Sequence, residues 1–256
     1  MPAKGFPVTP DDLVARSFTL SVTPGGAGAK TLTLPYRLYV PRDYVQSRRY
    51  PLVVVLHGAG EKGIDNQKHL GNGVLAFCDP ALQKRTPAFV VYPQCWEGAR
   101  WVESAWSEGR YDQAKVPLSE PLTALLALVP ALAKEFTLDP ARLLCAGLSM
   151  GGYGTWDLIT RFPAQFAGAV AICGGGDPTR AFAAKNVPVW AFHGSADEVV
   201  PVRGSRLMVE ALRKAGGKVK YTEWKGADHH IWERVFKDPA VPRWLLAQKQ
   251  AGRPAP

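Results

Sequence analysis

The most informative segment of the sequence is Leu143-Leu144-Cys145-Ala146-Gly147-Leu148-Ser149-Met150-Gly151-Gly152-Tyr153-Gly154. Its first half is an apolar run typical of a buried strand, and a Gly-x-Ser-x-Gly turn follows. After the turn, apolar side chains recur at helical spacing as far as Pro163. A serine on so sharp a strand-to-helix turn carries its hydroxyl above the sheet edge, and the flanking glycines relieve crowding. The segment predicts a nucleophile elbow, with Ser149 as the nucleophile.

Strand and helix patterns alternate on both sides of this elbow. Continuous apolar runs, typical of strands covered on both faces, occur at residues 51–56, 88–93, 169–173 and 187–192, and a last strand is predicted at 219–224. Helical patterns occur at residues 66–77, 119–136 and 202–215, and Pro130 predicts a kink or a break in the second. We therefore expect an α/β fold with a mostly parallel central sheet and helices on both faces.

The N-terminal part predicts a different kind of strand pairing. Residues 14–22 and 32–40 alternate between polar and apolar side chains, and a glycine-rich turn at residues 24–28 separates them. Such a pair forms an antiparallel edge of the sheet.

Length and composition limit the class of protein. A chain of 256 residues suits one large α/β domain, so we expect a single domain over residues 13–250 between loosely held tails at 1–12 and 251–256. The hydrophobic content of 46% is that of a globular protein, and no apolar run approaches the roughly 20 residues of a membrane helix. The net charge of +9 comes from scattered lysines and arginines. It predicts a solvated basic surface and neither a nucleic-acid nor a membrane partner.

The cysteines and the N-terminus carry little further information. Cys78, Cys95, Cys145 and Cys173 lack metal-ligand spacing, and no disulfide can be assigned from them. The first residues contain no apolar core of a secretory signal. The chain as given therefore favours the cytoplasm, and a chain trimmed of a leader would be extracellular.

The loop after the strand at residues 51–56 is the second functional candidate. It reads His57-Gly58-Ala59-Gly60. In α/β-hydrolases the loop after an early central strand supplies one N–H of the oxyanion hole, and the residue after the nucleophile supplies the other. By position these donors are Ala59 and Met150, whereas His57 ends a strand and is interpreted as structural.

The long segment after the strand at residues 88–93 is the third candidate, because it contains three tryptophans in eleven residues. A loop at the carboxyl end of a parallel strand faces the crevice in which open α/β sheets bind ligands. We expect Trp96 and Trp101 to contact substrate. Packing of these indoles in the core beneath the loop is the alternative, since tryptophan buries a large apolar area wherever it lies.

A serine nucleophile needs a histidine base that an acid holds in one tautomer. In α/β-hydrolases the chain order is serine, acid, histidine, each after a later strand. Asp197 and His229 satisfy this order after Ser149, with Glu198 and Asp228 as alternative acids. The residues alone leave the choice between His229 and the adjacent His230 open.

The chain resembles the bacterial α/β-hydrolase esterases described as predicted peptidases, phospholipase/carboxylesterase-like proteins, and polyhydroxybutyrate-depolymerase-like or feruloyl-esterase-like enzymes. The resemblance extends from about Tyr36 to Gln248 and implies the α/β-hydrolase fold. Its motifs are His57-Gly58-Ala59-Gly60-Glu61-Lys62-Gly63 with Asp65-Asn66, Pro93-Gln94-Cys95, Gly147-Leu148-Ser149-Met150-Gly151-Gly152, His193-Gly194 with Asp197, and Gly226 with His229 and Trp232. In that family the histidine stands three residues before the tryptophan, which implies His229. The chain departs from the family at Asp228, where a glycine is usual.

These observations predict a serine carboxylic ester hydrolase that acts through an acyl-enzyme on a small or aromatic ester, feruloyl esters included. The partner is then a small-molecule or polysaccharide-linked ester, and no metal or organic cofactor is required. The alternatives are a peptidase or a polyester or lactone hydrolase on the same triad, and a binding module that keeps the fold without catalysis. The oligomeric state is not predicted.

Overall fold

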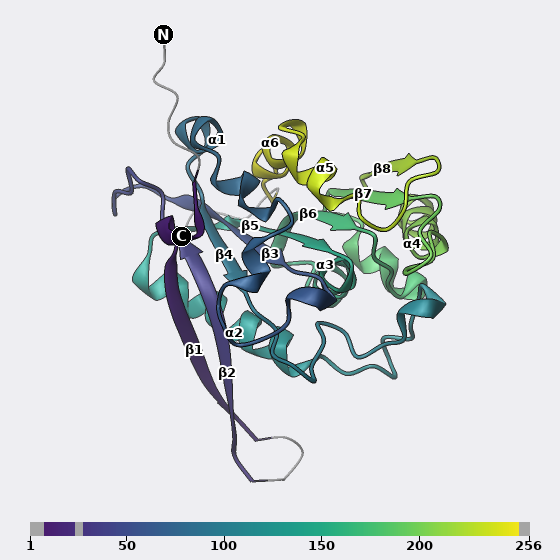
Figure 1. The fold of residues 1–256 in the computed structure, drawn as a ribbon, viewed down its shortest axis with the longest axis horizontal. Coiled ribbons are helices and arrows are strands. Elements are labelled where there is room, and N and C mark those ends of the chain that lie inside the picture. The colour runs from purple at the N-terminus through teal and green to yellow at the C-terminus, as the bar shows by residue number, and fades with distance from the viewer. Residues whose placement is uncertain (1–7, 24–27, 251–256) are drawn as a thin grey trace.

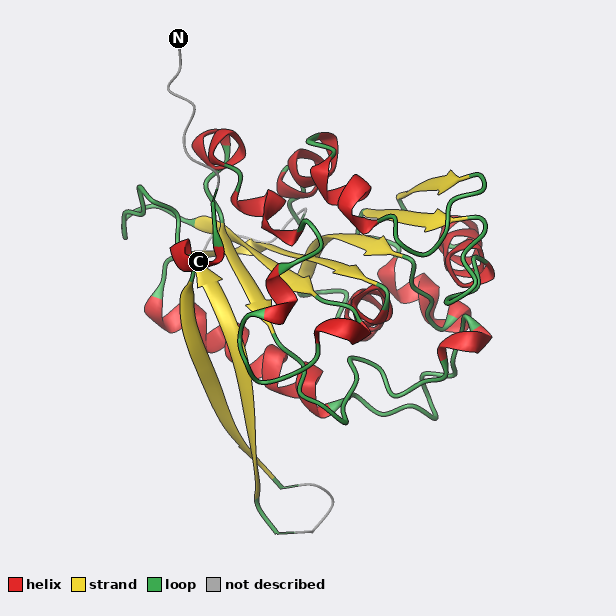
Figure 2. Cartoon of the chain, in the orientation of Figure 1, coloured by secondary structure: helices red, strands yellow, loops and turns green. Residues whose placement is uncertain are grey.

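The computed structural model describes residues 8–23 and 28–250 and contains one eight-stranded sheet (Figures 1 and 2). The strand order is β1-β2-β4-β3-β5-β6-β7-β8. The strands are β1 (Val14–Val22), β2 (Lys30–Tyr39), β3 (Tyr50–Leu56), β4 (Phe89–Pro93), β5 (Leu138–Leu148), β6 (Phe166–Ile172), β7 (Val189–Gly194) and β8 (Val219–Trp224). β2 pairs antiparallel with both β1 and β4, and every other pair is parallel. The predicted parallel sheet with an antiparallel N-terminal edge is confirmed.

Helices cover both faces of the sheet. They are α1 (Pro80–Arg85), α2 (Glu120–Glu135), α3 (Met150–Arg161), α4 (Arg203–Lys214), α5 (Trp232–Lys237) and α6 (Ala240–Leu246). In Figure 1, α1, α5 and α6 lie above the sheet, and α2, α3 and α4 lie below it. β1 and β2 extend beyond the rest of the molecule as a long hairpin (Figure 1).

The central strand β3 shows why two helical layers form. Leu52, Val54 and Leu56 pack in the core that includes α2, α3 and α4. Val53 and Val55 point the other way and pack with α1, α5 and α6. Since side chains alternate across a strand, a continuous apolar run buries both faces of the sheet.

Three local predictions differ from the structure. Residues 66–77 form 3₁₀ turns at Lys68–Leu70 and Val74–Cys78 instead of one helix. Asn66 and Asn72 both have positive φ, at 56° and 61°, which an α-helix cannot contain. The other two differences concern α2 and β5.

α2 continues through Pro130, so the helix does not break there. Pro130 is exposed, so its ring faces solvent and the lost hydrogen bond lies on the outer side of the helix. β5 begins at Leu138, five residues before the apolar run at 143–148 from which the strand was predicted.

Some predictions lie outside the described residues. They are most of the glycine-rich turn at 24–28, the C-terminal tail at 251–256 and the first seven residues of the N-terminal tail. Of that N-terminal tail, Pro10–Asp12 forms one 3₁₀ turn. Among the described residues, no helix has the length and apolar character needed to cross a membrane.

Candidate active site

The nucleophile elbow lies between β5 and α3. Ser149 has φ 53° and ψ −116°, a strained conformation for a residue with a side chain. A Cβ on Gly147 would stand 2.1 Å from the Gly151 carbonyl oxygen, and a Cβ on Gly151 would stand 2.1 Å from the Leu56 carbonyl oxygen. Only glycine permits this close approach of β5, α3 and the end of β3. The Gly-x-Ser-x-Gly pattern is therefore required by backbone packing.

The three predicted triad residues form one hydrogen-bonded chain. Ser149 Oγ lies 2.8 Å from His229 Nε2, and His229 Nδ1 lies 2.6 Å from Asp197 Oδ2. Asp197 follows β7 and His229 follows β8, so all three residues stand at the carboxyl ends of parallel strands. Each is buried, with 6–8% of its surface exposed. His229 is placed to accept the Ser149 proton while Asp197 holds its ring.

Asp197 accepts hydrogen bonds on both oxygens. Its Oδ1 accepts from the amides of Val199 and Val200, at 2.9 and 2.8 Å. Its Oδ2 accepts from His229 and lies 3.1 Å from His193 Nε2. Burial opposes ionisation of this carboxyl, but the hydrogen bonds from the two histidines and the Val200 amide outweigh it and lower the pKa of Asp197. The Asp197 carboxyl is therefore ionised at neutral pH.

The alternative residues do not join this chain. His230 is exposed, and its backbone N–H donates to Asp228 Oδ1 at 2.9 Å. The His230 ring lies 4.8 Å from that of Trp232. Glu198 is exposed. Asp228, which stands where the family usually has a glycine, thus stabilises the turn around His229 by accepting the His230 backbone N–H.

The predicted oxyanion donors begin two helical turns. Met150 is the first residue of α3, and Ala59 is the first residue of a 3₁₀ turn at Ala59–Glu61. Amides at such positions have no acceptor within their own helix, which leaves them available to an anion. The loop lies against the nucleophile, since a Cβ on Gly58 would stand 3.5 Å from Ser149 Cβ.

Glu61 fixes this loop from within. Its Oε2 accepts the Gly58 N–H at 2.7 Å. Burial raises the pKa of the Glu61 carboxyl, while the Gly58 hydrogen bond lowers it. Sequence reasoning gave Glu61 no role.

His57 is structural, as predicted. Its Nε2 accepts the Cys95 N–H at 2.9 Å and its Nδ1 donates to the Gly58 carbonyl at 2.6 Å, which fixes one neutral tautomer. Burial lowers the pKa of His57 to about 3. The imidazole therefore stays neutral and ties the oxyanion loop to the segment after β4.

The structure corrects the expectation for Trp101. This side chain is fully buried, and its indole N–H donates to the His57 carbonyl at 3.0 Å. A Cβ on Gly154 would stand 2.8 Å from Trp101 Cβ, so the indole packs against α3. Trp101 thus supports the oxyanion loop from the core, which was the alternative interpretation, and does not line an open surface.

Trp96 and Trp106 both pack against the large core cluster on the side of α2, α3 and α4, but their other surroundings differ. Trp96 is half-buried in a groove at the start of α2, whose lining residues include no member of the triad. Trp106 packs on a small cluster with Tyr153 and Val200. Tyr153 lies one turn after Ser149 in α3, and the Val200 amide holds Asp197. Trp106 therefore packs on residues that are close in the chain to Ser149 and Asp197, and the sequence did not distinguish it from Trp96.

The model of the phospholipase/carboxylesterase family matches residues 45–240, a span that contains every residue of the site described above. The chain belongs to this family. The match covers more than half of the chain and both loops that meet at the elbow.

A solved structure described as a thermostable esterase is 38% identical to the chain, with a TM-score of 0.82 over 94% of this chain and 64% of that one. An acylaminoacyl peptidase from Pyrococcus horikoshii, 15% identical with a TM-score of 0.64 over 96% of this chain and 43% of that one, shares the fold. A ferulic acid esterase, 16% identical with a TM-score of 0.63 over 90% of this chain and 99% of that one, shares it also. A curated relative, an uncharacterized secreted protein of Arthroderma benhamiae, is 25% identical over 86% of this chain and 27% of its own length. The chain thus spans less than two thirds of the thermostable esterase and of the curated relative.

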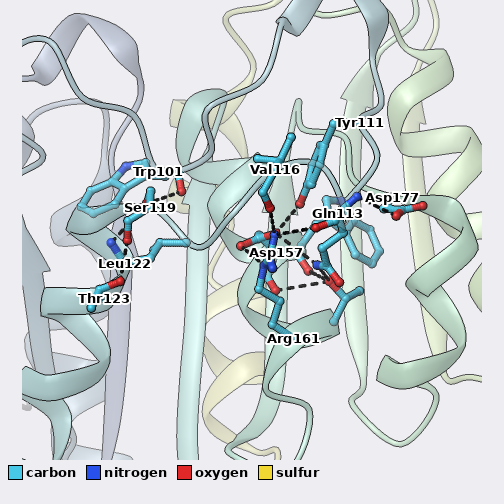
Figure 3. A network of polar contacts seen from close by, with 12 residues as sticks. Trp101, Tyr111, Gln113, Val116, Ser119, Leu122, Thr123, Asp157, Arg161 and Asp177 are labelled. Atoms are coloured by element: carbon cyan, nitrogen blue, oxygen red, sulfur yellow. Dashed lines mark hydrogen bonds and ion pairs between the residues drawn. The ribbon is translucent and has the colours of Figure 1, made fainter. Parts of the chain in front are cut away.

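A buried polar network anchors the segment that carries the tryptophans (Figure 3). Asp157 of α3 binds Arg161 through two contacts of 2.9 Å and accepts from Tyr111 at 2.6 Å and from Gln113 at 3.1 Å. The Gln113 amide donates to Asp177 at 2.9 Å. The helix that begins at the nucleophile is thereby joined to the segment that passes beside the triad.

Within the described residues, one set of side chains has the composition of a metal site. Potential ligand atoms of Cys173, His193 and Asp197 lie within 4.8 Å of one another. Burial raises the pKa of the Cys173 thiol, whereas metal binding requires the thiolate. Cys173 Sγ donates to the His229 carbonyl at 3.4 Å. These atoms fit a hydrogen-bonded support of the triad better than a metal centre.

Proposed function

We propose that the protein is a serine carboxylic ester hydrolase. The observation that carries this proposal is the chain from Ser149 Oγ to His229 at 2.8 Å and from His229 to Asp197 at 2.6 Å, on an elbow strained in the manner of a nucleophile. Membership of the phospholipase/carboxylesterase family and the likeness to a thermostable esterase support the same reaction class.

The mechanism follows from this geometry. His229 Nε2 takes the Ser149 proton as Oγ attacks the ester carbonyl carbon, and the carbonyl oxygen becomes an oxyanion that accepts from the amides of Ala59 and Met150. The tetrahedral intermediate collapses, the C–O bond to the alcohol breaks, and His229 gives the proton to the departing alkoxide. Water, deprotonated by His229, then attacks the acyl-enzyme and releases the acid. Asp197 orients the imidazole and stabilises its charged form in both steps.

We propose a small or aromatic ester as substrate, either free or linked to a polysaccharide. Tyr153 and Val200 are buried, so the half-buried Trp106 that packs on them is the side chain of this cluster that offers aromatic surface for such a group. The ferulic acid esterase shares only the fold, so a feruloyl ester is one member of the panel to be tested. We propose no nucleic-acid or membrane partner for the scattered lysine and arginine side chains.

The experiment measures hydrolysis of p-nitrophenyl acetate to laurate and of methyl ferulate by the wild type and by Ser149→Ala, His229→Ala and His230→Ala. We expect the first two variants to lose at least about 10³-fold in kcat and His230→Ala to keep most activity. Labelling of Ser149 by a fluorophosphonate gives a second readout that does not depend on the choice of ester.

Two results would reject the proposal. Full activity in Ser149→Ala would show that Ser149 is not the nucleophile. Absence of both labelling and turnover in the wild type would favour a binding module with this fold. If peptides, polyesters or lactones are hydrolysed faster than the simple esters, the triad stands and the substrate class changes.

A further inference from the structure

The acid of the triad has a second histidine beside it. His193 ends β7 and is fully buried, and its Nε2 lies 3.1 Å from Asp197 Oδ2 and 3.0 Å from the Val200 carbonyl oxygen. The same Asp197 oxygen binds His229 Nδ1 at 2.6 Å. One carboxylate oxygen is thus shared between the catalytic base and an imidazole that does not touch the nucleophile.

The contacts of His193 fix where its proton lies. The Val200 carbonyl and the ionised Asp197 carboxylate only accept, so Nε2 must carry a hydrogen, and this one hydrogen is divided between the Val200 carbonyl oxygen and Asp197 Oδ2. On the other side of the ring, Nδ1 lies 2.7 Å from Ser205 Oγ, which also lies 3.1 Å from the Gly174 carbonyl oxygen. In a neutral ring Nδ1 then accepts the Ser205 hydroxyl hydrogen, and the Gly174 carbonyl oxygen competes for that same hydrogen. Ser205 is itself fully buried.

We propose that His193 is a positioning residue for the esterase reaction: its Nε2–H shares Oδ2 of Asp197 with His229 and thereby sets how strongly the acid supports the charged form of the base. This inference rests on the proposed function. A carboxylate that gives part of its acceptor capacity to a second donor attracts the His229 proton less strongly. Removal of the His193 donor should therefore make His229 more basic.

The charged and titratable groups around His193 come from every element packed against it. Asp197 lies on its own loop, Cys173 follows β6, His229 lies beyond Asp197, and β8 places Glu223 opposite His193 in the register. Arg206 of α4 pairs with Glu223 at 2.6 Å, which offsets that charge. Asp197 is the carboxylate in direct contact with the ring.

The experiment compares His193→Leu, His193→Gln and the matched control His230→Gln in the pH profile of kcat/KM. Leucine removes the donor, and we expect the pKa of the acid limb, which reports His229, to rise by about 0.5–1 pH unit. We expect kcat to fall about 5- to 50-fold with little change in KM. The glutamine amide can donate to Asp197, and the acid limb should return to within about 0.2 unit of the wild type. His230→Gln changes an exposed side chain and should leave the limb in place.

A folded His193→Leu variant whose acid limb has the wild-type pKa would overturn the proposal. A His193→Gln variant whose acid limb shifts as far as that of His193→Leu would overturn it as well. Urea unfolding shows whether each variant is folded. A measurement on the wild type covers the case in which Leu fails to fold: ¹⁵N NMR of the imidazoles must find His193 protonated at Nε2, and an unprotonated Nε2 rejects the inference. Imidazole NMR also follows the titration of His229 in the resting protein, so the inference remains testable if no ester in the panel is hydrolysed.

Discussion

Asp197→Asn tests the role of the acid most sharply, because two backbone amides dictate how the new side chain is oriented. The amides of Val199 and Val200 only donate, at 2.9 and 2.8 Å, so the asparagine oxygen must take the place of Oδ1. Its NH₂ then stands where Oδ2 lay, 2.6 Å from His229 Nδ1 and 3.1 Å from His193 Nε2. The hydrogen on His193 Nε2 still has the Val200 carbonyl oxygen as its acceptor. His229 Nδ1 must accept, the ring proton moves to Nε2, and Nε2 can no longer take the Ser149 proton.

The size of the effect follows from the cost of the alternative orientation. Turning the amide to restore the correct tautomer sets its NH₂ against two buried donors, which costs about 1–3 kcal/mol for each unmade bond, or about 2–6 kcal/mol together. Loss of the negative charge beside the imidazolium adds to this. Since about 1.4 kcal/mol is tenfold in rate, we expect kcat/KM for p-nitrophenyl acetate to fall about 10³- to 10⁴-fold.

Asp228→Asn is the matched control. Asp228 is exposed and its Oδ1 accepts the His230 N–H at 2.9 Å, a bond that the asparagine oxygen can accept equally well. We expect activity within about threefold of the wild type. If Asp197→Asn kept more than a tenth of the activity while Asp228→Asn lost it, the acid would be Asp228 and the assignment of Asp197 would be refuted.

Three further predictions concern stability, each measured as the free energy of unfolding in urea. Gly147→Ala brings a Cβ to 2.1 Å from a backbone oxygen, so we expect a loss of about 3 kcal/mol or more, whereas Gly60→Ala meets no atom within 4 Å and should change stability by less than about 0.5 kcal/mol. Equal effects of the two would refute the packing argument. Burial lowers the pKa of His69 to about 4, below the 6.5 of the unfolded chain. The contribution of the neutral His69 ring to the free energy of unfolding is therefore complete above about pH 6.5 and is lost as the pH falls toward 4. Between pH 7 and pH 5 the wild type loses about 2 kcal/mol through His69, and His69→Gln, which can still donate to the Tyr92 carbonyl, should lose about 2 kcal/mol less; an unchanged loss contradicts this. Pro130→Ala restores an amide donor inside α2 and should stabilise by roughly 1–3 kcal/mol, and a destabilised variant would show that the proline ring is needed for packing.

The sheet and the meeting of Ser149, Asp197 and His229 were predictable because their sequence signals are local. A continuous apolar run such as residues 51–56 buries both faces wherever it lies in a sheet. The Gly-x-Ser-x-Gly pattern is itself enough to predict the sharp strand-to-helix turn at Ser149. The order of Ser149, Asp197 and His229 then placed the three side chains at one sheet edge, because parallel strands end there. The choice of His229 over His230 came from resemblance alone, and the structure shows its physical basis: the two adjacent side chains diverge, one into the site and one to solvent.

The predictions that failed depend on non-local packing. Nothing in the segment from Trp96 to Trp106 shows which indole meets the core, because the answer lies in Gly154 of α3 and the His57 carbonyl, both distant in sequence. The helix predicted at residues 66–77 failed because two asparagines accept positive φ there. The contact of His193 with Asp197 could not be predicted from the His193-Gly194 and Asp197 motif, because spacing in the chain does not show which side chains turn toward each other.

The loops that carry Asp197 and His229 contact each other through their backbones, and this contact fixes where the two side chains start. A Cβ on Gly194 would stand 2.2 Å from the Asp228 carbonyl oxygen and 2.4 Å from that of Ala227, so the loop after β7 touches the loop that carries His229. The Ala196 amide donates to the Ala227 carbonyl at 2.9 Å. Because β7 and β8 are neighbouring parallel strands, their carboxyl ends bring these loops together without a long connection. The spacing from Asp197 to His229 is therefore set by main-chain contacts, and the buried His193 contacts the same Asp197 carboxylate.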